Sequence, residues 1–278
     1  MGNISLFKAG VSTRDYYKTM NDALKAIDGD YHMLHYPLYL NGKDTFAQAQ
    51  KNLIDYCVGK LPSLEDKMIL DIGCGNGVLA LYVAGNYQPD KIVGVDLNAG
   101  NIEIAIREKN RRNIDNVEFM IADAQDLSDI ESNSFDVVVN IESAFHYPNK
   151  NMFLGEIYRV LKPGGNFVVA DILTTHNGDS KIKKNWKNKM LYNHWTMEKY
   201  LEGFELSGLK LKEKDDITEN VIKGFLVYRD YFMQFKIKGF LRKAFIKLFF
   251  VVNVKLIISL LKNKRKYLVF QGVKESAA

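Results

Sequence analysis

Three glycines at alternate positions follow a short apolar run, a spacing typical of a loop that binds a ligand with its backbone. The glycines are Gly73, Gly75 and Gly77. Glycine has no Cβ, so a ligand can approach the chain closely where a strand turns into a helix. Asp71, within the apolar run 68–72, directs a carboxylate at the same space. The spacing G-x-G-x-G differs from the G-x-G-x-x-G of dinucleotide loops, which argues against a pyrophosphate ligand.

Acidic residues stand at the ends of the next two apolar runs. Residues 91–97 are expected to form a second strand containing Asp96. An acidic side chain about 20 residues beyond such a loop commonly binds the two hydroxyls of a ribose. A third strand over 117–123 ends in Asp123. The alternatives are a helix N-cap for Asp96 and a surface turn for Asp123.

The elements that must position these residues alternate in type, which predicts an α/β fold with a doubly wound parallel sheet. Further strands are expected over 135–143 and 166–172, and helices over 78–87, 99–112 and 149–161. The strands are short and apolar without polar alternation, which fits a sheet covered by helices on both faces. An amphipathic helix over 44–61 precedes the loop, with Asp44 as its expected N-cap.

A helix stop, Leu161-Lys-Pro-Gly-Gly, precedes the fifth strand. With this stop, the order of motifs over residues 44–220 closely resembles the class I S-adenosylmethionine-dependent methyltransferases. Within that superfamily the chain is most similar to small-molecule methyltransferases related to ubiquinone and natural-product biosynthesis. The resemblance implies S-adenosylmethionine as the cofactor and a Rossmann-like sheet of seven mostly parallel strands. A helix is expected over 181–206 and the sixth strand over 209–217, and the seventh strand, over 267–273, would lie antiparallel.

The resemblance also assigns cofactor contacts. The residues implied at the methionine part of the cofactor are Asp71, Gly73, Cys74, Gly75 and Gly77. Asp96 would bind the ribose and Leu97 would contact the adenine. Asp123 would accept a hydrogen bond from the adenine amino group, beside the Ala124 backbone. Asn140 and Ile141, at the end of the fourth strand, face the cofactor in the resembled family.

A histidine just past the fourth strand is the candidate general base. Methyl transfer to a hydroxyl needs the acceptor aligned with the methyl group and benefits from a base that takes its proton. His146 lies where substrate is expected, and an unperturbed imidazole, with a pKa of about 6.5, suits that task at neutral pH. A capping or packing role is the alternative. Glu142 and Asp171 would orient His146 or bind a substrate hydroxyl, and Asp171 is an alternative base.

Aromatic side chains supply the candidate substrate contacts. Residues 1–43 are rich in Tyr and His, and such a segment commonly folds over the active site in the resembled family. Tyr36 and Tyr39 are the candidates there, and Tyr147 lies beside His146. If His146 is not the base, one of the N-terminal tyrosines or positioning alone becomes the better account.

Composition bounds the class of protein and its partners. The chain has 278 residues, a net charge of +5 and two cysteines, Cys57 and Cys74. A length of this order suits one elaborated domain, and two cysteines give no disulfide framework, so a reducing, cytoplasmic location is expected. The charge is too mild to predict nucleic-acid binding, and the sequence shows no cluster at metal-ligand spacing. A small-molecule substrate and a monomer or homodimer are expected.

A basic segment near the C-terminus stands apart from the predicted core. The expected organisation is an N-terminal lid over 1–43, a cofactor-binding core over 44–218, a helical cap over 219–266, and the last strand with its tail over 267–278. From Tyr231 to Lys274 there is no acidic residue, and residues 236–266 interleave Lys and Arg with apolar side chains. The segment is too charged for a transmembrane span. Either it packs on the core as a cap, or it lies in a membrane interface with lysines such as Lys243 and Lys247 near anionic headgroups.

The sequence therefore predicts a methyltransferase that acts on a small apolar or aromatic metabolite, at a hydroxyl oxygen. Carbon or nitrogen methylation of a natural product or lipid is the first alternative, in which positioning suffices without a base. A cofactor-binding cyclase that transfers no methyl group is the second. A nucleic-acid methyltransferase is disfavoured, because Asn140-Ile-Glu-Ser replaces the Asn/Asp-Pro-Pro-Tyr type of motif used on exocyclic amines.

Overall fold

The computed structural model gives most of the chain in atomic detail. The residues it describes are 17, 18, 21, 22, 25, 31–176, 192–234 and 240–276, without the side chains of 46, 228, 230–234 and 240–250. The predicted lid therefore lies largely outside the described residues, as do Lys236 and Lys238 of the basic segment and most of the helix expected before residue 197.

Seven strands form one sheet, and the fold class predicted from the sequence is confirmed. The strands are β1 (Met68–Ile72), β2 (Lys91–Asp96), β3 (Val117–Ile121), β4 (Phe135–Ile141), β5 (Leu161–Thr174), β6 (Leu209–Asp216) and β7 (Arg265–Lys274). Their order is β3-β2-β1-β4-β5-β7-β6, with β1 to β5 parallel and β7 antiparallel to both of its neighbours. The order reverses between β1 and β4, which in open α/β sheets marks the ligand-binding edge.

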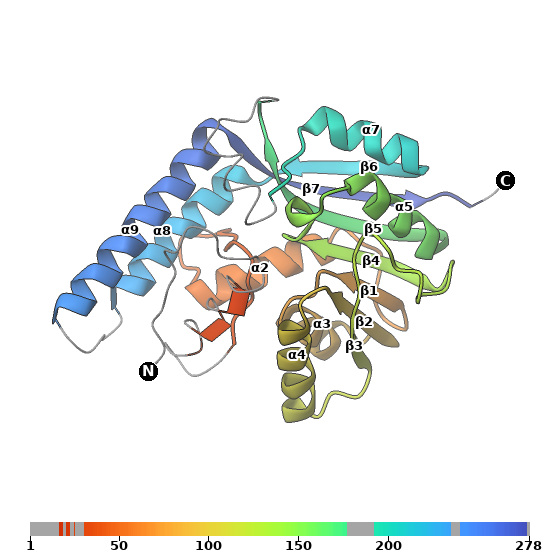
Figure 1. The fold of residues 1–278 in the computed structure, drawn as a ribbon, viewed down its shortest axis with the longest axis horizontal. Helices are drawn as coiled ribbons and strands as arrows, with labels where there is room; N and C mark the ends of the chain where they lie inside the picture. The colour runs from red at the N-terminus through yellow and green to blue at the C-terminus, as the bar shows by residue number, and fades with distance from the viewer. Residues whose placement is uncertain are drawn as a thin grey trace.

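Helices cover both faces of this sheet (Figure 1). The elements are α2 (Phe46–Val58), α3 (Val78–Tyr87), α4 (Ala99–Arg112), the 3₁₀ turn η1 (Ala144–His146), α5 (Lys150–Val160), α7 (Met197–Ser207), α8 (Thr218–Gln234) and α9 (Phe240–Asn263). One expected cap is wrong. Thr45 caps α2, whereas Asp44 accepts hydrogen bonds from Leu40 N and Asn41 N and closes the preceding turn.

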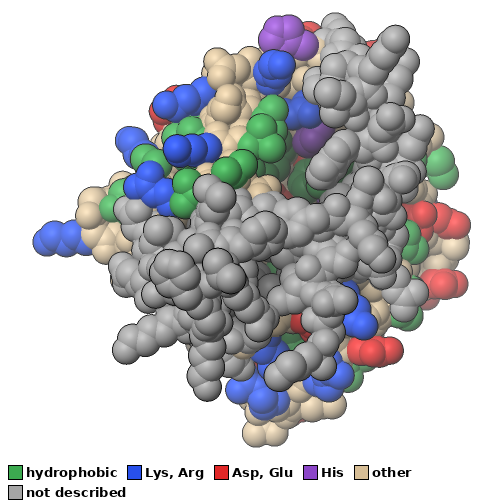
Figure 2. Space-filling model, turned by 60° about the vertical axis from the view of Figure 1, so that its left-hand side comes forward, with side chains coloured by type: hydrophobic (Ala, Val, Ile, Leu, Met, Phe, Trp, Pro, Cys, Tyr) green, Lys and Arg blue, Asp and Glu red, His purple; other side chains and the backbone are tan. Residues whose placement is uncertain are grey.

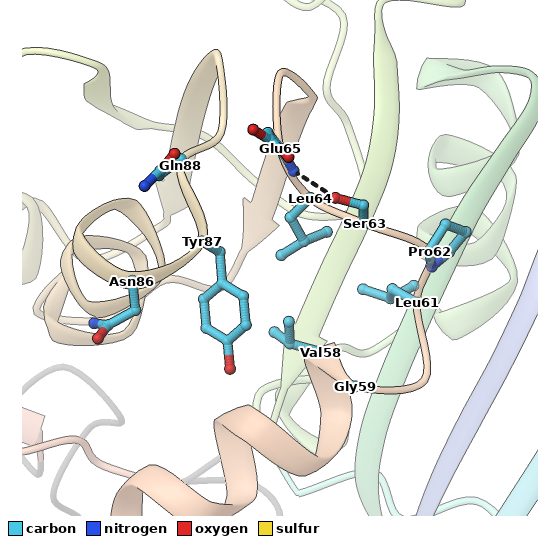
Figure 3. Close-up of a pocket in the computed structure, with 10 residues that line it drawn as sticks. All are labelled: Val58, Gly59, Leu61, Pro62, Ser63, Leu64, Glu65, Asn86, Tyr87 and Gln88. Carbon is cyan, nitrogen blue, oxygen red and sulfur yellow. Dashed lines mark hydrogen bonds between the residues drawn. The ribbon is translucent and has the colours of Figure 1, made fainter.

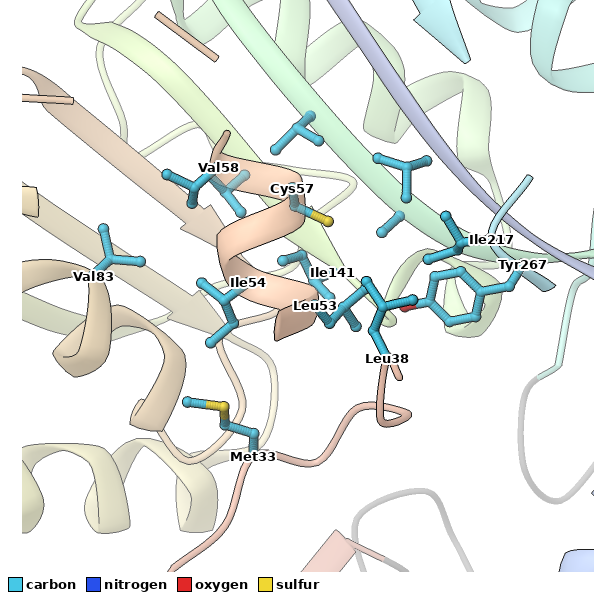
Figure 4. Close-up of a cluster of buried hydrophobic side chains, with 14 of the residues drawn as sticks. Met33, Leu38, Leu53, Ile54, Cys57, Val58, Val83, Ile141, Ile217 and Tyr267 are labelled. Atoms are coloured by element: carbon cyan, nitrogen blue, oxygen red, sulfur yellow. The ribbon is translucent and has the colours of Figure 1, made fainter. Parts of the chain in front are cut away.

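The core divides into two clusters because neighbouring residues of a strand point to opposite faces of the sheet. Ile69 packs on the face that carries α2 and α3, and Leu70 on the face that carries α5 and α7. Figure 4 shows the first cluster, in which α2 contributes Leu53 and Ile54. Tyr267 of β7 joins the same cluster. The sheet is therefore buried on both sides, as its continuous apolar strands predict.

The segment predicted as a helical cap is occupied by two long helices. α8 and α9 pack side by side and extend beyond the edge of the sheet (Figure 1). Among the residues that the structure describes, no helix is long and apolar enough to cross a bilayer. The extended segment 31–45 joins α8 to the core: Leu38 N donates to Ala49 O of α2 at 2.8 Å, and Tyr39 and Asn220 exchange two hydrogen bonds.

Gly224 of α8 makes this close approach possible, and its replacement is the first test of the packing. A Cβ at Gly224 would collide with the Pro37 carbonyl, whereas a Cβ at Gly155, inside α5, would meet nothing within 4 Å. Gly224→Ala should lower the free energy of unfolding by about 1–3 kcal/mol through overpacking. Gly155→Ala, the matched control, should raise it by up to about 1 kcal/mol through helix propensity. Equal effects in chemical denaturation would contradict the packing of segment 31–45 on α8.

Candidate active site

The predicted site residues gather at one edge of the sheet, because parallel strands bring their carboxyl ends together. Asp71 stands in β1 and Asp96 ends β2, while Asn140 and Ile141 end β4. Asp171 lies in β5, one strand further along the sheet. The side chains of Asp71, Asn140 and Asp171 are almost completely buried. Polar groups thus converge in a region of low dielectric constant.

The glycine loop has the left-handed backbone that its composition requires. Gly73, Gly75 and Gly77 have φ angles of 74°, 55° and 76°, which side chains other than glycine rarely adopt. Gly73 N donates to Val95 O at 2.7 Å, so the loop is fixed to the end of β2. A Cβ at Gly73 would collide with the Ser143 side chain, whereas a Cβ at Gly75 would approach only Leu34, at 3.9 Å. The backbone at Gly75 is accordingly the part of the loop that a ligand can reach.

Asp96 holds the loop to β2 and does not cap the following helix. Its carboxylate accepts hydrogen bonds from Gly75 N at 3.0 Å and Asn98 N at 2.8 Å. The α4 N-cap is Asn98, which accepts from Gly100 N. The capping alternative for Asp96 is therefore wrong. Leu97, the next residue, is 70% exposed and offers an apolar surface at the place predicted for the adenine.

Asp71 is a buried carboxylate beside the glycine loop. Its side chain is 2% exposed, and its Oδ2 has no hydrogen-bond partner among the described residues. Burial, and then the neighbouring charge of Asp96, raise the pKa of Asp71 to about 7. The same buried surroundings raise the pKa of the Cys74 thiol, so Cys74 is a small loop residue and not an activated nucleophile.

Asn140 presents a second unpartnered acceptor beside the loop. Its amide nitrogen donates to Ile72 O at 2.8 Å and to Ser143 Oγ at 2.6 Å. Its Oδ1 is buried and has no partner in the described part of the chain. Tyr147 also contacts Ser143, with 2.8 Å between the two hydroxyl oxygens. The Tyr147 hydroxyl, predicted to contact substrate, thus lies on the glycine-loop side of the turn.

The remaining predicted cofactor residues lie at the rim of the same edge. Asp123 accepts a hydrogen bond from Gln125 N at 2.9 Å, which closes a turn after β3, and its side chain is partly exposed. Ala124 and Ile141 are both buried. The turn at Asp123 is compatible both with the predicted adenine contact and with the surface-turn alternative.

His146 ends the 3₁₀ turn η1 and lies among aromatic rings. The Tyr17 hydroxyl is 2.8 Å from His146 Nε2. The Phe145 and Tyr192 rings lie 4.3 Å and 5.2 Å from the imidazole, measured between centroids. Asn193 N donates to Phe145 O at 2.6 Å, so residues 192–195 pass over the turn. The candidate base is thus held between Tyr17 of the N-terminal segment and the segment 192–195.

Asp171 is completely enclosed and fixes the turn that carries His146. Its Oδ1 accepts hydrogen bonds from Phe145 N at 3.1 Å and Ile172 N at 2.8 Å, and its Oδ2 accepts one from the Tyr200 hydroxyl. Lys150 Nζ lies 4.0 Å from Oδ2, with both side chains fully buried. Burial raises the pKa of Asp171, opposed by Lys150 and by these hydrogen bonds. Among the three roles that the sequence left open for Asp171, which are orienting His146, binding a substrate hydroxyl and acting as the base, this enclosure favours the first.

Glu142 ties the N-terminal segment to the end of β4. It has a φ of 53°, unusual for a side chain of this size, and its Oε1 accepts a hydrogen bond from Tyr36 N at 2.6 Å. Burial raises the pKa of Glu142 to about 8. The Tyr36 ring packs edge-on against Phe225 of α8. Tyr39, the other predicted substrate residue, has its backbone bonded to Asn220.

Comparison with known proteins identifies the family. Residues 64–229, more than half of the chain, match the family model described as methyltransferase domain. The chain belongs to this family. The match confirms the resemblance on which S-adenosylmethionine was predicted as the cofactor.

Known proteins are similar to part of the chain in sequence or to its whole fold in structure. A fatty-acid O-methyltransferase of Mycolicibacterium smegmatis is 44% identical over 108 residues, which are 39% of this chain and 38% of that protein. The chain thus matches under two fifths of that relative's length. A phosphoethanolamine N-methyltransferase of Haemonchus contortus, solved with S-adenosyl-L-methionine, has a TM-score of 0.78 at 23% identity, covering 96% of this chain and 60% of that one. The [4+2]-cyclase SpnF has a TM-score of 0.76 at 20% identity, with 96% and 100% covered.

The residues of this site fit the cofactor in charge and shape. Asp71 Oδ2 and Asn140 Oδ1, the two buried atoms at the loop without a partner among the described residues, are both acceptors, and the amino acid portion of S-adenosylmethionine carries an ammonium group that donates hydrogen bonds. The backbone at Gly75 is open to a ligand. An exposed Leu97 and a carboxylate at Asp96 stand where the adenine and ribose were predicted.

Several groups at the candidate site were not predicted from the sequence. They are Tyr17, Ser143, Tyr192 and His194. Residues 192–195 stand within a range expected to be helical, and only the tertiary fold brings their rings onto Phe145. Ser143 follows Asn140-Ile-Glu, and its closeness to a strand end was the signal that could have found it. In the described residues no group of three or more His, Cys, Asp or Glu gathers to hold a metal ion.

A surface hollow of about 430 Å³ lies away from this chemistry. Figure 3 shows it between the end of α2, the loop to β1 and the end of α3. Its lining residues are Val58, Gly59, Leu61, Pro62, Ser63, Leu64, Glu65, Asn86, Tyr87 and Gln88. These residues precede β1 or stand at the end of α3, so the hollow adjoins the amino ends of the strands, opposite to the site.

Replacement of Asp71 is expected to raise the stability of the cofactor-free protein and to weaken cofactor binding. The pKa of Asp71 is about 7 in the folded protein and about 4 in the unfolded chain. The folded protein therefore loses stability as the pH rises from about 4 to about 7. Asp71→Asn should therefore raise the Tm of the cofactor-free protein at about pH 8 more than at about pH 5, while weakening S-adenosylmethionine binding about tenfold or more.

Exposed Asp90 is the matched control: Asp90→Asn should change neither the Tm nor the affinity. An Asp71→Asn variant whose Tm gain is the same at both pH values would contradict the buried, unpaired carboxylate. Calorimetric titration measures the affinity in the same preparations.

Proposed function

We propose that this protein transfers a methyl group from S-adenosylmethionine to a hydroxyl oxygen of an apolar, lipid-like molecule. The observation that carries the proposal is the place of His146, on the turn that follows β4 at the edge where Asp71, Asp96 and Asn140 gather. The bound cofactor would supply a methyl group activated by its sulfonium. The protein must supply alignment, exclusion of water and a proton acceptor.

The proton acceptor in this scheme is His146 Nε2. It would take the hydroxyl proton as the substrate oxygen forms its bond to the methyl carbon. The Tyr17 hydroxyl lies 2.8 Å from Nε2, so the substrate hydroxyl would have to take its place at the single lone pair of an unprotonated Nε2. Asp171 holds Phe145 N and thereby positions the turn without contacting the reacting atoms.

An apolar acceptor fits the surroundings of His146. The rings of Phe145 and Tyr192 stack 5.9 Å apart beside the imidazole. A relative named fatty-acid O-methyltransferase supports a lipid acceptor and an oxygen nucleophile. A fatty-acid carboxylate is already ionised at neutral pH and needs no base, whereas an alcohol or phenol does. We therefore propose a hydroxyl acceptor, because the imidazole of His146 can take the proton of an alcohol or phenol.

Two alternatives predict different products. Carbon or nitrogen methylation would also consume the cofactor but would place little demand on His146. A reaction without methyl transfer is favoured by one comparison only, the likeness of the fold to the [4+2]-cyclase SpnF. Production of S-adenosylhomocysteine with hydroxylated lipids and fatty acids separates these cases. Turnover of a substrate without that product would favour the cyclase alternative.

Replacement of His146 tests the base directly. With a hydroxyl acceptor, His146→Ala should lower kcat by roughly 10²–10⁴ with little change in S-adenosylmethionine affinity. In the unmodified protein, kcat/KM should rise with pH through the imidazole pKa, because only the neutral ring accepts a proton. His176, an exposed histidine after β5, provides the control, and His176→Ala should retain full activity. A flat pH profile together with an active His146→Ala variant would rule out the base and favour positioning alone.

A further inference from the structure

We propose that the helix pair α8–α9 docks the protein onto an anionic lipid surface. This inference concerns a surface distinct from the proposed active site, and it holds whatever the acceptor is. It rests on the exposed face of α9, on the charge of the C-terminal segment, and on the contacts of α8 with the site.

The described half of α9 exposes apolar side chains on one face. Val252 and Leu256, one turn apart, are 53% and 55% exposed. Lys255 and Ser259 lie on the same face, at helical spacings of three and four residues, and both are exposed. Val254 and Leu261, seven residues apart on another side of the helix, are buried. An exposed face that mixes large apolar and cationic side chains is the pattern of a helix lying in a membrane interface.

Charge complementarity identifies the partner as anionic. α9 contains five Lys or Arg residues and no Asp or Glu, and no acidic residue occurs from Tyr231 to Lys274. Lys255, Lys262 and Lys264 are exposed. Lys266 is excluded from the docking set because it pairs with Asp216 at 2.6 Å. Figure 2 shows hydrophobic and Lys or Arg side chains gathered on this side of the molecule.

Docking on a bilayer surface accounts for the exposed apolar face of α9 and for its positive charge better than insertion across the bilayer does. No described helix is long and apolar enough to cross a membrane. A lysine near an anionic surface contributes about 1 kcal/mol, so a few suffice for reversible, salt-sensitive attachment. Exposed Val252 and Leu256 would then enter the acyl boundary, which charge alone cannot explain.

The other side of the pair leads to the active site. α8 packs on the extended segment through Phe225 against Tyr36 and through Asn220 with Tyr39. Tyr36 N in turn binds Glu142 at the end of β4. A protein docked through α9 would thus hold this edge of the site close to the lipid surface. If the proposed function is correct, this placement would let an apolar acceptor reach the site from the bilayer.

Cosedimentation with vesicles tests the proposal. The probes are vesicles of phosphatidylcholine alone and of equal parts phosphatidylcholine and phosphatidylglycerol. The protein should bind the anionic vesicles reversibly, bind much less to the neutral ones, and be released by salt. The variant Lys255→Glu/Lys262→Glu/Lys264→Glu should lose binding more than tenfold, because each lysine accounts for roughly a fivefold change. Val252→Ser/Leu256→Ser should also bind more weakly, and its remaining binding, carried by the lysines, should still be released by salt.

The control variant makes the same change of charge elsewhere. Arg107, Lys199 and Lys212 are exposed on α4, α7 and β6, and Arg107→Glu/Lys199→Glu/Lys212→Glu should bind vesicles nearly as the unmodified protein does. Circular dichroism and S-adenosylmethionine titration would verify that every variant is folded. His146→Ala should bind vesicles normally, so that a failed methylation assay and a failed docking assay are distinguishable.

Three outcomes would overturn the proposal. The first is no cosedimentation of the unmodified protein with anionic vesicles at low salt. The second is an equal loss of binding in the two charge-reversal variants, which would indicate attraction by net charge alone. The third is a dimer in gel filtration that Val252→Ser/Leu256→Ser dissociates, because the face would then be covered by a second copy of the chain.

Discussion

A buried carboxylate, one oxygen of which has no hydrogen-bond donor among the described residues, governs the architecture of this site. Asp71 lies at the ligand-binding edge of the sheet, next to a second carboxylate, and one of its oxygens is left without a partner in the described structure. Such an arrangement costs stability unless a cation or a donor completes it. The protein retains it, which is the expected signature of a site that binds a positively charged ligand.

The glycine loop and the strand ends follow from that constraint. The ligand must reach Asp71 past the loop, so the chain there has no room for side chains at Gly73 and a left-handed backbone at three positions. Asp96 fixes the loop through Gly75 N. The same strand edge sets the place of the base, because η1 follows β4 directly and is fastened by Asp171. The buried ion pair of Asp171 and Lys150 contributes more to fixing the geometry of this turn than to the net stability of the fold.

Much of this could be predicted from the sequence because the information is local. Short apolar runs, spaced glycines and acidic strand ends follow each other in a fixed order. These patterns predicted the sheet, and they placed Asp71 and Asp96 at its ligand-binding edge. Caps were harder, since Thr45 and Asp44 are neighbours and either residue type can cap a helix. The role of Asp171 depends on Lys150 and Tyr200, which approach it only in the folded chain. Tyr17 and residues 192–195 also approach the turn at His146 only in the folded chain, and no local sequence pattern predicts these contacts. The cytoplasmic location and the oligomeric state stay predictions.

The central claim is that this edge binds S-adenosylmethionine through the carboxylate at the end of β2. Isothermal titration of the purified protein with S-adenosylmethionine, beside Asp96→Ala and the exposed-residue control Asp126→Ala, measures it most directly. Two charge-assisted hydrogen bonds to the ribose predict at least about a tenfold loss of affinity in Asp96→Ala. The Asp126→Ala variant should match the unmodified protein. Unchanged affinity in a folded Asp96→Ala variant, or no binding to the unmodified protein, would contradict the account.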